Sequence, residues 1–347
     1  MPAISIDTFF ACTLLVSAAV IATAFVTGTL QTQINETQDL NKQEYLRTIA
    51  DAIVSGYGSP TDWGSTGTAP ASFGLSAVNA SGLFEVDIDK VSRLNSQGES
   101  VLSYPEVSKA ARLNNVALGI SVTQILSVDV ELVGNSTGEN STAYTFRVQV
   151  SQDSRQLSAS LHCYVVTPSF LCSVSNDTTN IGEGWVTVEV PNSSSGPTIL
   201  VVFARASLDG RMTAYAVYPF AHLSDEPSPN QTYLRLSPLN YMLNVSPNST
   251  GVASENCYAL SYAYAENLTQ TSETVYSVPR LLDRSPMILV VNGSGDSESF
   301  IEWCSYPQVP LEFGADFAGA EENVFTYTVA IKDALYRLTL RFGGVIR

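Results

Sequence analysis

The feature that most constrains the fold is an apolar stretch near the N-terminus, residues 9–30 (FFACTLLVSAAVIATAFVTGTL). It has 22 residues and contains neither a charge nor a proline. As a helix it would extend about 33 Å, enough to cross a hydrocarbon layer of about 30 Å. We therefore expect a membrane-spanning helix. Residues 1–7 contain no Lys or Arg, so we expect an uncleaved or barely trimmed signal anchor rather than a secretory signal peptide.

The helix is expected to continue beyond the apolar stretch. Residues 31–54 contain no Gly or Pro, and apolar side chains recur along one helical face. Residues 56–64 (GYGSPTDWG) should end it, because glycine permits left-handed backbone and proline cannot continue a helix. Residues 1–55 are thus predicted to form an N-terminal transmembrane and extended amphipathic helix.

The rest of the sequence is typical of an exported β protein. The formal charge is −16, although only 14% of residues are charged, which makes nucleic acid and anionic lipid unlikely partners. Strand-forming segments recur at short spacing from residue 117 onward. The expected fold class is mainly β with a long N-terminal α-helix: a transmembrane or pilin-like helix followed by one or two β-sandwich domains.

The best linker candidate is residues 191–197 (PNSSSGP), because proline, glycine and serine favour turns and loops. We therefore predict a first β-rich extracellular domain over residues 56–190 and a second, sandwich-like extracellular domain over 197–347. A single large sandwich is the alternative.

Eleven N-x-S/T sequons predict a glycosylated exterior; the alternative is that Asn and Ser cluster in the turns of any β protein. The candidate acceptors are Asn35, Asn79, Asn135, Asn140, Asn176, Asn192, Asn230, Asn244, Asn248, Asn267 and Asn292.

Four of the five cysteines lie downstream of the apolar stretch, which contains Cys12. Loop closure favours pairing Cys163 with Cys172 and Cys257 with Cys304, one of three connectivities. Such disulfides would agree with an exterior location. The alternative is four buried free thiols, with Cys12 facing lipid.

Three segments resemble a known family: AISIDTFFACTLLVS at residues 3–17, DLNKQEYLRTIADAIVSGYGSPTDWG at 39–64, and DIDKVSRLNS at 87–96 with LSYPEVSKAARL. They are similar to archaeal membrane-anchored proteins of the type IV pilin-like class, over roughly residues 3–120. The resemblance implies a helix that is anchored in the membrane and able to bundle into a filament core, with a β-rich head outside.

Asp7 gains a role from this resemblance. With Ala3 counted as the first mature residue, Asp7 is fifth, where a pilin carboxylate can neutralise a neighbouring subunit's N-terminal amine. Alternatively, Asp7 caps the N-terminus of the anchor helix.

No catalytic, cofactor or metal site is predicted. His162 and His222 belong to no zinc motif, and the sequence has no nucleophile elbow, P-loop or dinucleotide fingerprint. Two acidic groups have the ligand type for calcium: Asp62, Asp87 and Asp89, and Glu321 with Glu322. We favour the alternative interpretation, that these residues belong to solvated acidic turns. For Tyr258, Tyr262 and Tyr264, an aromatic binding surface is one interpretation. We favour the other, in which the tyrosines mark one face of a half-buried strand.

The sequence therefore leads us to expect a non-enzymatic cell-surface protein, a pilin-like subunit of a filament or surface assembly. A solitary anchored binding or adhesion module is the first alternative, and an anchored hydrolase the second. The expected partners are membrane lipid and copies of the same chain through helix bundling, with N-linked glycans attached. The expected location is the cell membrane or a surface filament, with the bulk of the chain extracellular.

Overall fold

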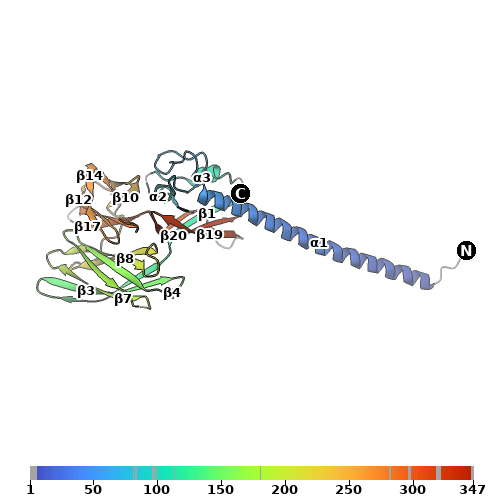
Figure 1. Cartoon of the computed structure of the whole chain (residues 1–347), viewed down its shortest axis with the longest axis horizontal. Coiled ribbons are helices and arrows are strands. Elements are labelled where there is room, and N and C mark those ends of the chain that lie inside the picture. The colour runs from blue at the N-terminus through green and yellow to red at the C-terminus, as the bar shows by residue number, and fades with distance from the viewer. Residues whose placement is uncertain are drawn as a thin grey trace. The chain divides into compact units, whose positions relative to one another are not determined.

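The computed structural model describes residues 6–80, 82, 84–95, 98, 100–113, 115–179, 181–280, 283–295, 298–317 and 322–344. The side chains of residues 6–8 and 28–39 lie outside this description. The chain forms two compact units, Met1–Ala50 and Asp51–Arg347. The first is helical and the second is built mainly of strands (Figure 1). This confirms the predicted fold class, a long N-terminal helix followed by a mainly β structure.

Helix α1 spans Ile6–Ser55 without interruption, as its continuous helix-compatible sequence predicted. In its apolar part, four hydroxyl groups each donate to the carbonyl oxygen of the residue four positions earlier, at 2.6–2.8 Å. These residues are Thr13, Ser17, Thr23 and Thr27. This back-bonding satisfies the side-chain donors without water, as an apolar environment requires.

Two short helices follow α1. The N-terminal cap of α2 (Ile88–Ser92) is Asp87, whose carboxylate accepts the Lys90 backbone N–H at 3.1 Å. Helix α3 (Tyr104–Ala110) begins after Ser103, whose backbone N–H donates to the Glu106 carboxylate at 2.7 Å. Ser103 and Glu106 form a capping box, and Pro105 in the first turn suits a helix start because it needs no backbone donor there.

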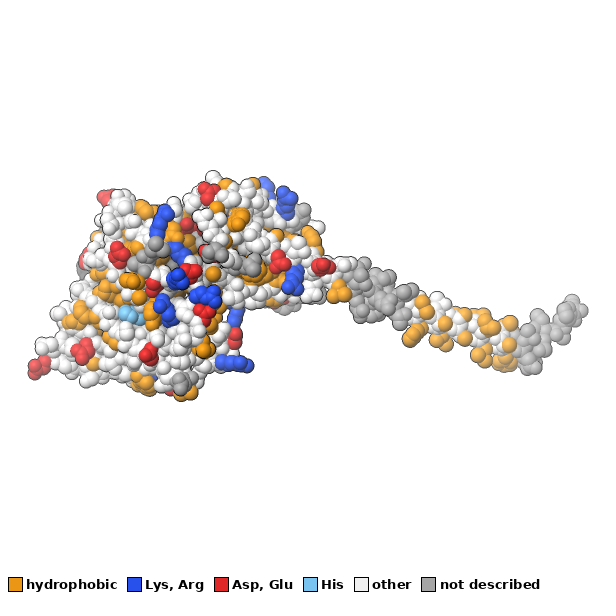
Figure 2. Space-filling view, viewed as in Figure 1, with side chains coloured by type: hydrophobic (Ala, Val, Ile, Leu, Met, Phe, Trp, Pro, Cys, Tyr) orange, Lys and Arg blue, Asp and Glu red, His pale blue; other side chains and the backbone are white. Residues whose placement is uncertain are grey.

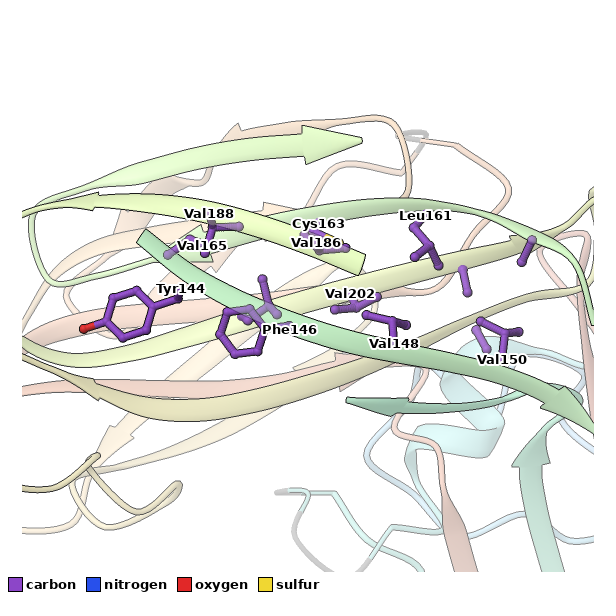
Figure 3. Close-up of a cluster of buried hydrophobic side chains, with 14 of the residues drawn as sticks. Tyr144, Phe146, Val148, Val150, Leu161, Cys163, Val165, Val186, Val188 and Val202 are labelled. Carbon is purple, nitrogen blue, oxygen red and sulfur yellow. The ribbon is translucent and has the colours of Figure 1, made fainter. Parts of the chain in front are cut away.

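The next part of the chain is a β-sandwich of two four-stranded sheets. The first contains β2 (Ser127–Thr137), β3 (Ser141–Gln152), β4 (Arg155–Gln156) and β7 (Glu183–Pro191). The second, which we call the central sheet, has the order β6-β5-β8-β9 and contains β5 (Ala159–Val166), β6 (Leu171–Asp177), β8 (Gly196–Ala206) and β9 (Thr213–His222). Side chains from both sheets, among them Phe146, Leu161 and Val202, form one core between them (Figure 3).

The central sheet is covered on its other face as well. Tyr164, Ile199 and Phe203 point away from the first core and pack against a third sheet. That sheet has the order β13-β12-β16-β17 and contains β12 (Val252–Leu260), β13 (Ala265–Asn267), β16 (Met287–Gly295) and β17 (Glu298–Tyr306). Three sheets are therefore layered, and β8 is apolar on both faces because it lies in the middle.

Two further four-stranded sheets complete the strand-rich unit. One contains β1 (Ala117–Gln124), β18 (Leu311–Gly314), β19 (Glu322–Ile331) and β20 (Ala334–Gly343). The other contains β10 (Leu234–Leu239), β11 (Met242–Pro247), β14 (Thr269–Ser272) and β15 (Val275–Ser277). Strand β1 pairs with β20, so the start of the β region is joined to its end.

The observed organisation differs from the predicted division at residues 191–197. They comprise the end of β7, a turn over residues 192–195 and the start of β8. Both strands contribute to the same core, and Asn192 fixes the turn by donating to the Gly138 carbonyl at 2.9 Å. The compact units meet instead between Ala50 and Asp51. A polar Pro-Asn-Ser segment marks a turn within a sandwich as well as it marks a linker, so composition alone does not distinguish the two.

Because the central sheet is shared by two cores, both cores should unfold together. Leu161→Ala in the first core and Phe203→Ala in the second remove side chains that are at most 1% exposed. Each should lower the free energy of unfolding by about 2–5 kcal/mol and shift the same single transition in calorimetry of the detergent-solubilised chain. Leu208→Ala, at a side chain 84% exposed, is the control and should have little effect. Two transitions that respond separately to the core variants would contradict the layered arrangement.

Candidate functional site

Large hydrophobic side chains are exposed along the apolar part of α1. Phe9–Thr27 has 19 residues with a mean hydropathy of 2.4, and none of it is buried. Figure 2 shows hydrophobic side chains covering this part of the helix. By length and composition the segment is able to cross a membrane, a property that it shares with signal sequences.

Helix α2 contributes a fully buried lysine. Lys90 donates to the carbonyl oxygens of Tyr57 at 2.8 Å and Ser76 at 2.7 Å, and its ammonium lies 5.8 Å from the centroid of the Trp63 ring. Burial lowers the pKa of Lys90, and the nearby carboxylate of Asp87 opposes this shift. Both carbonyl groups belong to the loop that follows α1, so Lys90 holds that loop in place.

Arg93 completes this arrangement from the end of α2. Its guanidinium donates to the carbonyl oxygens of Trp63, Thr68 and Ser100, and lies 5.6 Å from the Trp63 ring centroid. The indole of Trp63 in turn donates to the Gly74 carbonyl at 3.0 Å. We call Trp63, Lys90 and Arg93 the cation–tryptophan cluster. Its donors are engaged by main-chain carbonyls, which indicates a structural role.

Asp89 connects α2 to the sheets. Its carboxylate accepts the Tyr306 hydroxyl at 2.6 Å and the Asn240 backbone N–H at 2.8 Å. Burial raises the pKa of Asp89. It also lowers the pKa of the nearby Lys332 to about 8. The Lys332 ammonium lies 4.0 Å from the centroid of the Tyr241 ring. The cavity beside this group measures only about 10 Å³. Shifted pKa values often mark active sites, but here the space admits at most one water molecule.

The histidines have local partners. His162 Nδ1 lies 2.9 Å from the Ser175 hydroxyl, and burial lowers the pKa of His162. In a serine hydrolase, Nε2 contacts the nucleophile and Nδ1 contacts the acid. Here Nδ1 contacts the serine, while the neighbouring Asp283 carboxylate accepts hydrogen bonds from Ser285 and forms an ion pair with Arg205 at 3.5 Å. This pair therefore lacks the arrangement of a triad.

His222 is fully buried at the end of the central sheet. Its Nε2 lies 3.0 Å from the Pro191 carbonyl oxygen and its Nδ1 lies 2.9 Å from the Tyr144 hydroxyl. Because a carbonyl oxygen can only accept a hydrogen bond, Nε2 must be the donor and carries the proton. His222 thus links β9 to the end of β7.

The acidic residues considered for calcium do not converge within the described chain. Groups of three or more His, Cys, Asp or Glu side chains that could hold a metal ion are absent from the described residues. Asp87 caps α2 and Asp89 accepts from Tyr306, so both have structural partners. Glu321 lies outside the described residues.

The predicted aromatic surface is only partly exposed. Tyr264 is exposed, but Tyr258 and Tyr262 are half-buried against the core between the central and third sheets. The guanidinium of Arg205 lies 3.8 Å from the Tyr262 ring centroid and covers that ring. Tyr258 lies in β12, as the strand prediction requires, whereas Tyr262 and Tyr264 lie in the turn between β12 and β13, so the prediction of a strand is wrong for these two.

The four downstream cysteines are free thiols, which corrects the predicted disulfides. Cys163 lies opposite Val174 and Cys172 opposite Val165, so the two cysteines are diagonal neighbours on paired strands. Diagonal Cα atoms are about 7–8 Å apart, beyond the usual disulfide range of about 4.4–6.8 Å.

Cys257 and Cys304 are farther apart in the third sheet. Cys257 lies opposite Val291 on one side of β16, and Cys304 lies opposite Leu289 on its other side. Two strand spacings amount to roughly 9–10 Å, too far for a disulfide. Burial raises the pKa of Cys257 and Cys163 to about 12, so both thiols are protonated near neutral pH.

The candidate glycan acceptors differ in accessibility. Six are exposed: Asn79, Asn135, Asn140, Asn176, Asn248 and Asn267. Three are half-buried: Asn192, Asn230 and Asn244. Asn292 is fully buried and its amide donates to the Pro168 carbonyl at 2.8 Å, so the folded chain leaves no room for a glycan there. The side chains of Asn35 and Asp7 lie outside the described part of α1.

A hollow that sequence reasoning missed lies where edge strands β9 and β17 meet the 306–310 segment. It measures about 310 Å³, and we call it the amide hollow. The residues that line it include Tyr215, Asn230, Gln231, Trp303, Ser305 and Gln308. The described residues that line it carry no charge. Single-sequence patterns could not reveal it, because its walls come from five separate parts of the chain.

The walls of the amide hollow are held by hydrogen bonds. The Asn230 amide donates to the Trp303 carbonyl at 3.0 Å and accepts the Trp303 backbone N–H at 2.9 Å, as a neighbouring strand would. The fully buried Glu302 carboxylate accepts the Tyr233 backbone N–H at 2.8 Å and that of Gln231. Burial raises the pKa of Glu302, and these backbone donors oppose the shift. The Tyr215 hydroxyl donates to the Val309 carbonyl and fixes the opposite wall.

Comparisons with known proteins leave the family open. No family model matches the chain, and no curated protein matches it. Among the solved structures with some similarity is HBP35 of Porphyromonas gingivalis, with 11% sequence identity and a TM-score of 0.22. The match covers 52% of this chain and 63% of that protein, so the chain spans less than two thirds of its length. A TM-score this low supports no argument about fold or function.

The cation–tryptophan cluster yields a prediction. Lys90→Met keeps the length of the side chain but leaves the Tyr57 and Ser76 carbonyls without their donor. The free energy of unfolding should fall by about 2–5 kcal/mol, measured by denaturant titration. The matched control is Lys109→Met, at an exposed lysine of α3, which should have an effect within about 0.5 kcal/mol. Equal effects of the two variants would show that the buried ammonium is dispensable.

Proposed function

We propose that this chain is a non-enzymatic, membrane-anchored surface protein of the pilin-like class. In this proposal the apolar part of α1 lies in the membrane or in a bundle of identical helices. The strand-rich unit from Asp51 onward is the part displayed outside. The observation that carries the proposal is the bare apolar segment Phe9–Thr27 within an unbroken helix of 50 residues.

The exposed side chains of this segment support the proposal. Leu14, Leu15 and Ile21 are 72%, 72% and 69% exposed, so these large apolar side chains are not buried by the described part of the chain. Water contact costs about 25 cal/mol for each Å² of apolar surface, which favours burial in lipid or against other helices. The segment would extend about 29 Å as a helix, close to the thickness of a hydrocarbon core.

A solitary anchored binding module is the second candidate. The amide hollow favours it, because a rigid concave site with aromatic and amide walls is typical of ligand recognition. The two candidates share the anchor and the exposed unit. They differ in whether α1 packs against copies of itself.

Cys12 allows the two candidates to be distinguished. It is the exposed cysteine within the apolar segment, whereas the other four are buried or half-buried. Mild oxidation of native membranes should give dimers linked through Cys12 if the helices bundle, and Cys12→Ser should abolish them. Electron microscopy of the purified native protein should show filaments in the same case.

The anchor itself is tested by fractionation. The native chain should remain with membranes or surface assemblies after alkaline carbonate washing and should need detergent for extraction. Recovery of the full-length chain in the soluble fraction would refute the anchor. Monomeric particles without Cys12 crosslinks would refute the filament and leave the solitary module.

An exterior location also predicts a pattern of glycosylation. Mass spectrometry of glycopeptides from the native protein should find sugar at exposed acceptors such as Asn135 and Asn267, and none at the fully buried Asn292. The buried sequon serves as the internal control because it also has the N-x-S/T pattern. Sugar at Asn292, or none at any exposed sequon, would contradict the expected pattern.

A further inference from the structure

Basic side chains gather at one end of the layered sheets, although the chain carries a formal charge of −16. The Leu335 backbone N–H donates to the Arg211 carbonyl at 3.0 Å, and the Lys332 ammonium donates to the Arg280 carbonyl at 2.7 Å. These contacts join the β8–β9 turn, the β19–β20 turn and the segment before β16. Figure 2 shows Lys and Arg side chains gathered on one face of the strand-rich unit. We call the following residues the basic end: Arg205, Arg211, Arg280, Arg284 and Lys332.

The basic end keeps an excess of positive charge. Three of its arginines form ion pairs: Arg205 with Asp283, Arg211 with Asp209, and Arg284 with Asp333. Arg280 and Lys332 form no ion pair with the described residues, and they lie 5.0 and 4.0 Å from the centroid of the Tyr241 ring. The carboxylate of Asp89 also attracts Lys332, but it is only 7% exposed and already accepts the Tyr306 hydroxyl. Two of the five cations therefore remain available to a partner.

The opposite end of the same strands is acidic. Strand β9 begins two residues after Arg211 and ends three residues before Asp225. Strand β8 runs the other way, from Gly196 at the acidic end to Ala206, the residue after Arg205. The ten residues of β9 separate the two ends by about 30 Å, at about 3.3 Å per residue.

A hollow of about 530 Å³ lies at the acidic end. Its described lining includes the carboxylates of Asp225, Glu226 and Glu298 and contains no Lys, Arg or His; we call it the acidic hollow. All three residues are exposed, and none of them forms an ion pair with the described residues. Pro227 and Pro229 restrict the backbone of the same wall, so little conformational freedom is lost when a partner docks.

The two ends are complementary in charge but cannot meet within one copy, because the sheets hold them apart. Guanidinium groups pair with carboxylates through charge-assisted hydrogen bonds, and arginine is enriched at protein interfaces. Contact between two basic ends would bring like charges together, which is unfavourable. Charge complementarity therefore favours a second copy of this chain as the partner, bound through its other end. Contacts between unlike faces of identical chains generate rings or open filaments.

We propose that copies of this chain associate head to tail, with the basic end of one strand-rich unit docked on the acidic hollow of the next. This contact goes beyond the proposed function and uses no part of α1. It can therefore fail while the anchor stands, and the anchor can fail in fractionation while this contact stands.

The test is sedimentation velocity of the full-length chain in detergent at neutral pH, with a reductant so that Cys12 cannot link copies. Arg280→Glu reverses an exposed charge of the basic end and should raise the dissociation constant at least about tenfold. Lys109→Glu on α3 changes the net charge equally and is the matched control, so it should associate as the unchanged chain does. Equal effects of the two variants would overturn the proposal, as would a failure of the unchanged chain to associate.

Glu226→Lys tests the other side of the contact. It makes the chain less acidic, which would strengthen association that depends on net charge alone, whereas the proposed contact should weaken at least about tenfold. An equal mixture of Arg280→Glu and Glu226→Lys chains should associate again, because one unaltered basic end then meets one unaltered acidic hollow. Restored association would also show that both variants are folded. A mixture that stays dissociated would overturn the head-to-tail contact.

Carbodiimide crosslinking locates the contact. Lys332 is the one lysine of the basic end, so it should become joined to Asp225, Glu226 or Glu298 of another copy. Mass spectrometry of mixed isotope-labelled and unlabelled full-length chains should find these peptides with one labelled and one unlabelled partner. Lys332→Arg keeps the charge and should remove the crosslink without changing the dissociation constant by more than about twofold. Crosslinking of Lys332 in native membranes to a different protein, and not to another copy, would overturn the proposal.

Discussion

The arrangement of the strand-rich unit depends on two buried cations that collect main-chain carbonyl oxygens. The loop after α1 forms little regular structure, so several of its carbonyl groups need donors from elsewhere. Lys90 supplies them from a helix of five residues, and Arg93 from the position directly after it. The same helix carries Asp89, which binds the Tyr306 hydroxyl at the end of β17. One short helix therefore joins the segment after α1 to the layered sheets, and its buried charges are tolerated because each meets a specific polar partner.

The central sheet explains why the strand-rich unit does not separate into two domains. Alternate residues of β8 enter different cores: Leu200 and Val202 face one, and Val201 and Phe203 face the other. A strand with two apolar faces must be covered on both sides, so its two neighbouring sheets are obliged to share it. The pairing of β1 with β20 adds a second connection between distant parts of the chain. The predicted boundary at residues 191–197 therefore falls on a turn.

The sequence predicted what local rules control and missed what depends on distant packing. The long helix followed from its sequence, because helix formation depends on residues near one another in the chain. The disulfides were wrong because strand register, not sequence separation, sets the distance between Cys257 and Cys304. The amide hollow could not be predicted, since Gln308 and Tyr215 meet only through the layering of sheets.

The hydroxyl groups along the apolar part of α1 have a consequence for how such helices could recognise one another. Thr13, Ser17, Thr23 and Thr27 each commit their only O–H proton to their own backbone. Neighbouring copies would therefore find no strong polar donor on this described stretch of helix, and selection between registers would rest on the fit of small against large side chains. Lateral association of this kind should respond little to acidity or salt, and strongly to the thickness and fluidity of the surrounding lipid.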